Sequence, residues 1–166
     1  LKNTRAYMGV LERLLAHHPK KDYWADLLAH LESQQGFARE LAIDVLRLQF
    51  AVGAFSEATE YVDLAQQSLK AGFAAEALKV LEAGVQAKLL GVGPQTPEHV
   101  RLLTQVRKLV QEDLASGAMP VLPGDPGHLF AAGYNRVLQG DRARGLEILE
   151  QALPMPALTR ERDARL

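Results

Sequence analysis

The sequence predicts an all-α fold of about eight helices, and three observations support that prediction. Apolar residues recur every three to four positions along almost the whole chain, which is the period of a helix with one buried face. Leu and Ala dominate the apolar residues, whereas the β-branched and aromatic residues that favour strands are sparse. No segment alternates apolar and polar residues long enough to indicate a strand.

The first three expected helices end at residues that commonly stop a helix. The first covers residues 4–17, and we expect Asp22 to cap the second, which ends at Gly36. The third runs over about 37–52 and ends at Gly53, because glycine readily adopts the left-handed conformation that follows a helix. The apolar face of the first helix consists of Tyr7, Val10, Leu11, Leu14 and Leu15.

The remaining helices are separated by glycine turns and two longer loops. Ser56 is expected to cap the fourth helix, and Gly72 separates it from the fifth. Thr96 and Pro97 suit the N-cap and first position of the sixth, which extends to about Ser116. The last two helices are expected over residues 126–139 and 142–152.

Two helix pairs repeat the same pattern of large and small residues. Their turn glycines, Gly72 and Gly140, lie 68 positions apart, which is twice a 34-residue repeat period. Antiparallel helices pack closely only where a small residue faces a large one, so matching sizes indicate matching packing. The matched large residues are Tyr61 with Leu129 and Leu81 with Leu149; the matched small ones are Ala65 with Gly133, Ala77 with Gly145 and Gly84 with Ala152. At one further matched position, Leu64 corresponds to Ala132.

We therefore expect residues 1–166 to form a single helical-repeat domain, a right-handed α-solenoid of antiparallel hairpins cut from a longer array. The approximate repeats are 20–53, 56–90, an irregular 97–124, and 126–157, with partial repeats at 4–19 and 158–166.

Three blocks, YMGVLERLLAHHPKKDYWADLL, GFARELAIDVLRLQFAVG and DLAQQSLKAGFAAEALKVLEAG, resemble a group of exported proteobacterial tetratricopeptide-repeat proteins. The resemblance covers most of residues 5–115 and continues more weakly over 129–166. It implies a periplasmic or otherwise exported helical-repeat protein with no established activity. Composition alone leaves a cytoplasmic location open.

The chemistry-bearing residues predict no enzyme, metal site or cofactor. The chain has no Cys, and the neighbours His17 and His18 point about 100° apart on a helix. His30, His99 and His128 lack the spacing of metal ligands and suit solvated or capping roles. GVGP and GDPG lack the lysine of a phosphate-binding loop. A net charge of −1 argues against nucleic acid, and no apolar stretch reaches the length of a membrane span.

The remaining candidate surface is the groove that first helices line in tetratricopeptide arrays. Mapping that pattern gives Thr59, Val62, Asp63, Gln66, Lys70, Phe130, Tyr134 and Leu138. Chaperone-binding relatives clamp a terminal carboxylate with Lys and Asn, and this chain has other residues at those positions. An aromatic groove would suit an apolar or amphipathic peptide. The alternative is that Phe130 and Tyr134 only pack against neighbouring helices.

The sequence thus predicts a scaffold that binds a protein or peptide partner in this groove. Two other classes stay open: an enzyme or small-ligand-binding domain on a helical scaffold, and a structural spacer within a longer exported protein. Neither end has the polar face of a terminal repeat, so self-association through the ends is a further expectation.

Overall fold

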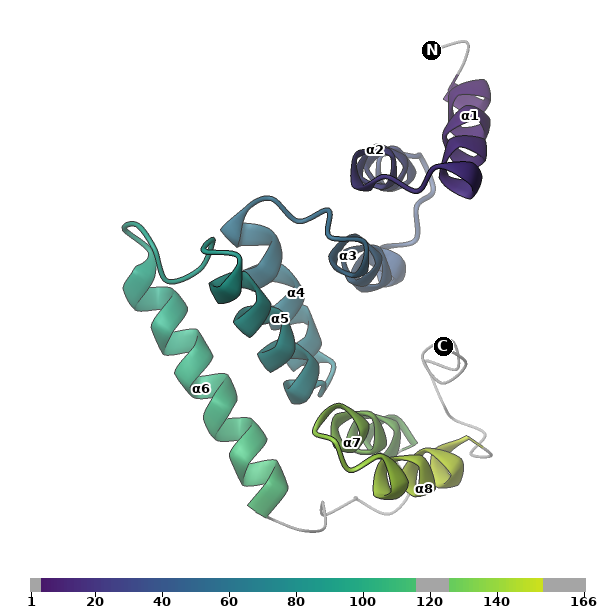
Figure 1. Ribbon diagram of the computed structural model, residues 1–166. Helices are drawn as coiled ribbons and strands as arrows, with labels where there is room; N and C mark the ends of the chain where they lie inside the picture. Colours follow the sequence, from purple (N-terminus) through teal and green to yellow (C-terminus); the bar gives the residue numbers. More distant parts are fainter. Residues whose placement is uncertain (1–3, 116–125, 154–166) are drawn as a thin grey trace. The chain divides into compact units, whose positions relative to one another are not determined.

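The computed structural model describes residues 4–115 and 126–153, and within these ranges the chain is helical, with no strand (Figure 1). This confirms the all-α prediction and the expected number of helices. The elements are α1 (Thr4–His17), α2 (Lys21–Glu32), the 3₁₀ turn η1 (Arg39–Leu41), α3 (Ala42–Ala51), α4 (Ala58–Lys70), α5 (Ala74–Gln86), α6 (Thr96–Ala115), α7 (Pro126–Leu138) and α8 (Arg142–Ala152). They fall into two compact units, residues 1–60 and 61–166.

In the first unit, α2 packs against both α1 and α3. The buried apolar residues of this unit are Leu11, Leu15, Leu28, Ile43, Val45 and Phe55. Two residues expected on the buried face of α1 are instead exposed: Tyr7 is 43% exposed and Val10 is 53% exposed. Tyr7 donates a hydrogen bond to the Asp26 carboxylate of α2, which explains why its ring lies at the edge of the helix pair.

The helix starts in this unit differ from the predicted ones. Lys20 is the N-cap of α2 and makes no side-chain capping bond, so Asp22 lies in the first turn rather than at the cap. There its carboxylate complements the positive end of the helix dipole. The predicted third helix begins as η1 before α3. The expected stop at Gly53 is confirmed, because this glycine directly follows the C-cap of α3 and has a φ of +69°. The stop predicted at Gly36 is wrong, because α2 already ends at Glu32 with Ser33 as its C-cap, and Gly36, with a φ of +94°, lies in the turn that follows.

In the second unit, α4 and α5 form a hairpin around Gly72, whose φ is +85°. The predicted small residues Ala65 and Ala77 are fully buried. A β-carbon on Gly84 would lie 2.7 Å from Leu90 Cδ1 and 3.0 Å from Tyr61 Cδ1, so Leu90 and the large ring of α4 together fill the space that the glycine of α5 leaves. Size complementarity therefore operates in this hairpin as the repeat pattern predicts.

A buried polar pair crosses the same hairpin. Ser68 Oγ of α4 donates to Glu76 Oε2 of α5 over 2.9 Å, and both residues are buried. Burial of a carboxylate is costly unless it accepts hydrogen bonds, so this bond restricts how the two helices can align.

The long helix α6 packs along α5. Arg107 of α6 pairs with Glu82 of α5 at 3.0 Å. Thr96 is the first residue of α6 rather than its N-cap, and its hydroxyl donates to the Gly93 carbonyl over 2.7 Å. The helix therefore begins one residue earlier than predicted and is joined to the preceding loop.

The α7–α8 hairpin crosses at two glycines, as its pattern predicts. A β-carbon on Gly133 would lie 2.9 Å from the Gly145 carbonyl oxygen, and one on Gly145 would lie 2.8 Å from the Gly133 oxygen. The two backbones therefore approach too closely to admit any side chain at the crossing. The turn glycine, Gly140, has a φ of +96°, and Asp141 caps α8 by accepting from the Arg144 N–H.

Candidate binding surface

The polar side of α4 is the most open part of the predicted groove. Asp63, Gln66 and Lys70 are exposed and recur every three to four residues, so they share one face of the helix. Thr59 is also exposed, and Val62 is half-buried. The side chains of Asp63, Gln66 and Lys70 form no hydrogen bond or ion pair with another described residue. Their polar groups face solvent and are available to another chain.

The aromatic residues of α7 occupy a different environment. Phe130 is only 6% exposed, and its ring lies edge-on to Phe73 with centroids 6.0 Å apart. Tyr134 lies 5.3 Å from the same Phe73 ring and stacks on Phe130. Tyr134 and Leu138 remain half-buried. Phe130 therefore packs in the interior, as the alternative reading of the sequence holds, and the exposed lining comes mainly from α4.

These rings belong to an apolar cluster that joins the two hairpins. Phe73 lies in the α4–α5 turn, and it packs with the first half of α7 and with α8. Figure 1 shows α7 nearly end-on and α5 from the side, so the two helices run in different directions. The members of the cluster are Phe73, Leu129, Phe130, Ala131 and Ala152, with Ala71, Tyr134, Ile148 and Leu149 packed against it.

A buried side-chain amide accompanies this cluster, and the sequence pattern did not single it out. Asn135 of α7 is 3% exposed. Its Nδ2 donates to the Gly72 carbonyl over 2.9 Å, and its Oδ1 accepts from the Ala75 N–H over 3.2 Å. The only available signal was an Asn in the middle of an apolar helix, where this residue is unfavourable unless its side chain has partners.

A second polar link connects α7 to α6. Arg136 donates to the main-chain carbonyl of Asp113 over 3.1 Å. Partial burial raises the pKa of the Asp113 carboxyl group, and the positive charge of Arg136 lowers it to a smaller extent. The net upward direction means that the folded state binds the proton of this carboxyl group more tightly than an unfolded chain does.

The histidines do not gather into a site. His99 is buried, and its Nδ1 accepts from the Gly91 N–H at 3.3 Å, which is a loop-capping role. His30 lies 3.9 Å from Asp26 and against the Tyr7 ring. The hydrogen bond to Asp26 raises the pKa of the Tyr7 hydroxyl, as do burial and the negative charge of Asp26.

The described ranges hold neither a metal-binding cluster nor a membrane-spanning helix. Residues 4–115 and 126–153 contain no group of three or more His, Asp and Glu residues that could hold a metal ion. No helix in these ranges has the length and apolar character needed to cross a membrane.

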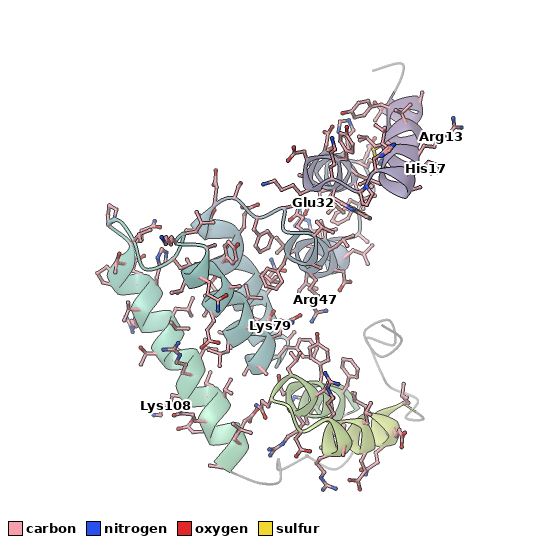
Figure 2. All side chains as sticks on the ribbon, viewed as in Figure 1. Arg13, His17, Glu32, Arg47, Lys79 and Lys108 are labelled. Carbon is pink, nitrogen blue, oxygen red and sulfur yellow. The ribbon has the colours of Figure 1, made fainter. Side chains whose placement is uncertain are left out.

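Helices α5 and α6 also carry exposed lysines. Figure 2 labels Lys79 on α5 and Lys108 on α6, and both residues are exposed. Lys108 pairs with Glu112 one turn later at 3.7 Å. These lysines lie outside the predicted groove and provide matched controls for charge changes on α4.

No protein-family model matches this chain, and neither a curated protein nor a solved structure does. A function therefore has to be inferred from the residues of the chain and their packing.

Proposed function

We propose that this chain is a helical-repeat scaffold of the tetratricopeptide type that binds a polypeptide segment along the exposed face of α4. The observation that supports the proposal is that two hairpins, 68 residues apart in the sequence, pack in the same way. In both, a glycine of positive φ makes the turn and small residues occupy the helix crossing. Stacked hairpins of this kind form a solenoid whose first helices share a concave side.

The charges on α4 define the partner that we propose. Asp63 and Lys70 lie two turns apart, about 10 Å along the helix axis. Three residues of an extended chain also span about 10 Å. A segment with a basic and an acidic residue three positions apart could pair with both, while its backbone bonds to Gln66 between them. Pairs of this kind fix orientation more than they add affinity.

The experiment is selection of binding peptides from a displayed random library against the whole chain, with affinity then measured by fluorescence anisotropy. Asp63→Lys and Lys70→Glu should each weaken a selected peptide about ten-fold or more, because each leaves a charged group facing a like charge. Swapping the matching charge on the peptide should restore binding. The control variants Lys79→Glu and Lys108→Glu should leave the affinity within about two-fold, since surface charges contribute little on their own.

Two outcomes would contradict the proposal. If all four variants bind the selected peptides equally well, the α4 face is not the binding surface. If no peptide can be selected, a structural spacer or a small-ligand-binding domain becomes the better interpretation.

The proposed exported or periplasmic location rests on the sequence resemblance, and fractionation of the producing cell with an antibody against the intact protein tests it.

A further inference from the structure

The residue at the N-cap of α5 has no side chain that can cap the helix. The first four N–H groups of a helix have no partner within the helix and need one elsewhere. The N-cap of α5 is Phe73, which makes no side-chain hydrogen bond. Ser, Thr, Asp or Asn would ordinarily stand at this position. The phenyl ring is instead 2% exposed within the apolar cluster, so the residue that begins the helix contributes packing and leaves the capping to another group.

Asn135 supplies that capping group from α7. Its side chain binds both sides of the Phe73 position: the Gly72 carbonyl before it and the Ala75 N–H after it. The first partner needs a donor and the second an acceptor, and a side-chain amide is the group that offers both from one planar end. An apolar residue of similar size would leave the Gly72 carbonyl and the buried Ala75 N–H without these bonds.

The surroundings of Asn135 hold the two bonds in place. Phe73, which lies between the two bonded backbone groups, packs edge-on against Phe130 and Tyr134 of α7 in the apolar cluster. A β-carbon on Gly72 would lie 3.3 Å from the Ala131 methyl carbon, so α7 rests directly on the turn. Little space separates the two hairpins at this point.

We infer that Asn135 is a positioning residue that couples the two hairpins, because it caps α5 only when α7 is docked. The first turn of α5 then becomes ordered together with the packing of α7 on it. The two backbone groups that the amide binds fix the orientation of α7 on the turn. This inference goes beyond the proposed function, since it requires no partner and concerns how the scaffold keeps its shape.

The test is amide hydrogen exchange, measured by nuclear magnetic resonance on the full chain, with Asn135→Ala and Asn135→Asp. Asn135→Ala should speed exchange at Ala75 by about ten-fold relative to the helix centres of α4 and α5, because the N–H loses its acceptor. Asn135→Asp keeps an acceptor for Ala75 but turns a negative oxygen toward the Gly72 carbonyl. It should retain much of the Ala75 protection while lowering the melting temperature.

Gln67→Ala is the matched control, because Gln67 lies 68 positions earlier at the equivalent place in α4, and its side chain forms no hydrogen bond with a described residue. It should leave exchange at Ala75 unchanged. A uniform rise in exchange throughout α4–α8 in both Asn135 variants would overturn the inference, because it would show a general loss of stability without a specific cap. Unchanged exchange at Ala75 in Asn135→Ala would overturn it as well.

Discussion

At the scale of single residues, the tightest constraint is the helix crossing of α7 and α8. The atoms that a β-carbon on Gly145 would meet include the Gly133 oxygen and the Val137 nitrogen, both at 2.8 Å. Both are backbone atoms, so a rotamer change cannot relieve the clash. Close packing of this kind makes even one added methyl group costly.

We expect Gly145→Ala to lower the free energy of unfolding by about 1–3 kcal/mol or more, because α8 must move away from α7. Gly9→Ala in α1 is the control. No atom lies within 4 Å of a β-carbon at Gly9, so alanine should be neutral or stabilise by about 0.5–1 kcal/mol. Urea denaturation of the two variants measures the difference. Equal destabilisation would show that the crossing is not the constraint.

Gln139, next to the turn glycine of α7–α8, carries a buried amide. Its Oε1 and Nε2 are both buried without a hydrogen-bond partner in the described structure. Replacing such a group with an apolar one of similar size removes a desolvation cost of about 1–3 kcal/mol. Gln139→Leu should therefore raise the melting temperature in calorimetry, whereas Gln66→Leu, on an exposed face, should not.

Asp113 should make stability depend on pH. Its carboxyl pKa is raised above the ordinary 3.8, mainly by burial, so the folded state favours the protonated form. Its contribution to stability is fully present below the ordinary value and is lost as the pH rises through the raised one. Asp113→Asn should therefore be stabilising at neutral pH, and the gain should shrink in acid. Urea denaturation at several pH values checks this, and a gain that grows in acid would contradict it.

At the scale of single elements, the start of α4 shows how a helix can be capped from within. Glu60 Oε2 accepts from the N–H groups of Ser56 and Glu57, each at 2.7 Å. This is the returning half of a capping box, in which an acid in the first turn reaches back to the residues before the helix. It also places a negative charge at the positive end of the helix dipole.

Glu60→Ala should cost about 1 kcal/mol of unfolding free energy, because two N–H groups lose their acceptor. Glu57→Ala is the natural control, since the Glu57 carboxylate makes only a long bond of 3.4 Å to Thr59. Thermal unfolding followed by circular dichroism compares the two. A larger loss in Glu57→Ala would contradict the assignment of the cap to Glu60.

Helix ends were predicted best at glycines, whose backbone conformation stops a helix, and less well at N-termini, where several neighbouring residues could serve as the cap. Gly53, Gly72 and Gly140 adopt positive φ, as a glycine after a helix commonly does, whereas α2 ends at Glu32, before the predicted stop at Gly36. The predicted cap at Asp22 was wrong, because α2 starts two residues earlier than a cap there would allow. Propensity identifies which residues can cap, and the local chain path decides which of them does.

At the scale of the whole molecule, burial is unevenly distributed between the two units. The largest fully buried side chains of the described residues are Phe73, Leu64, Leu81, Val80, Val106 and Ser68. All of them belong to residues 61–166 and none to residues 1–60. Elements with few buried contacts open at lower free energy than the core of the same chain.

We therefore expect amides of α1–α3 to exchange with solvent faster than those of α4–α6, by about ten-fold or more. Hydrogen exchange followed by mass spectrometry on the intact chain measures this. Fragments from α6, which has its own apolar stripe against α5, serve as the protected reference. Equal protection of the two units would mean that the chain unfolds as one cooperative body.

The sequence pattern did not predict how α7 packs on the α4–α5 turn. Phe130 and Tyr134 match positions that line a groove in a regular array, and the same spacing also suits residues that pack on a neighbouring turn. Their burial depends on Phe73, 57 positions before Phe130, which the repeat pattern does not mark. Local periodicity predicts which residues share a helix face, but long-range packing decides which surface covers that face. Asp63, Gln66 and Lys70 of α4 are exposed, and their role in binding a partner stays a prediction.

The glycine pair at the α7–α8 crossing also limits how modules of this chain can be exchanged. The equivalent places in α4–α5 hold Ala65 and Ala77, and two methyl groups need more room than the close approach of Gly133 and Gly145 leaves. A chimaera with the second hairpin rebuilt from the first would therefore need a wider helix spacing. The residues that replace Ile148 and Leu149 would then not pack on the cluster around Phe73 at the same depth. If repeats of this protein are exchanged, each hairpin would therefore have to be transferred together with the residues that it packs against.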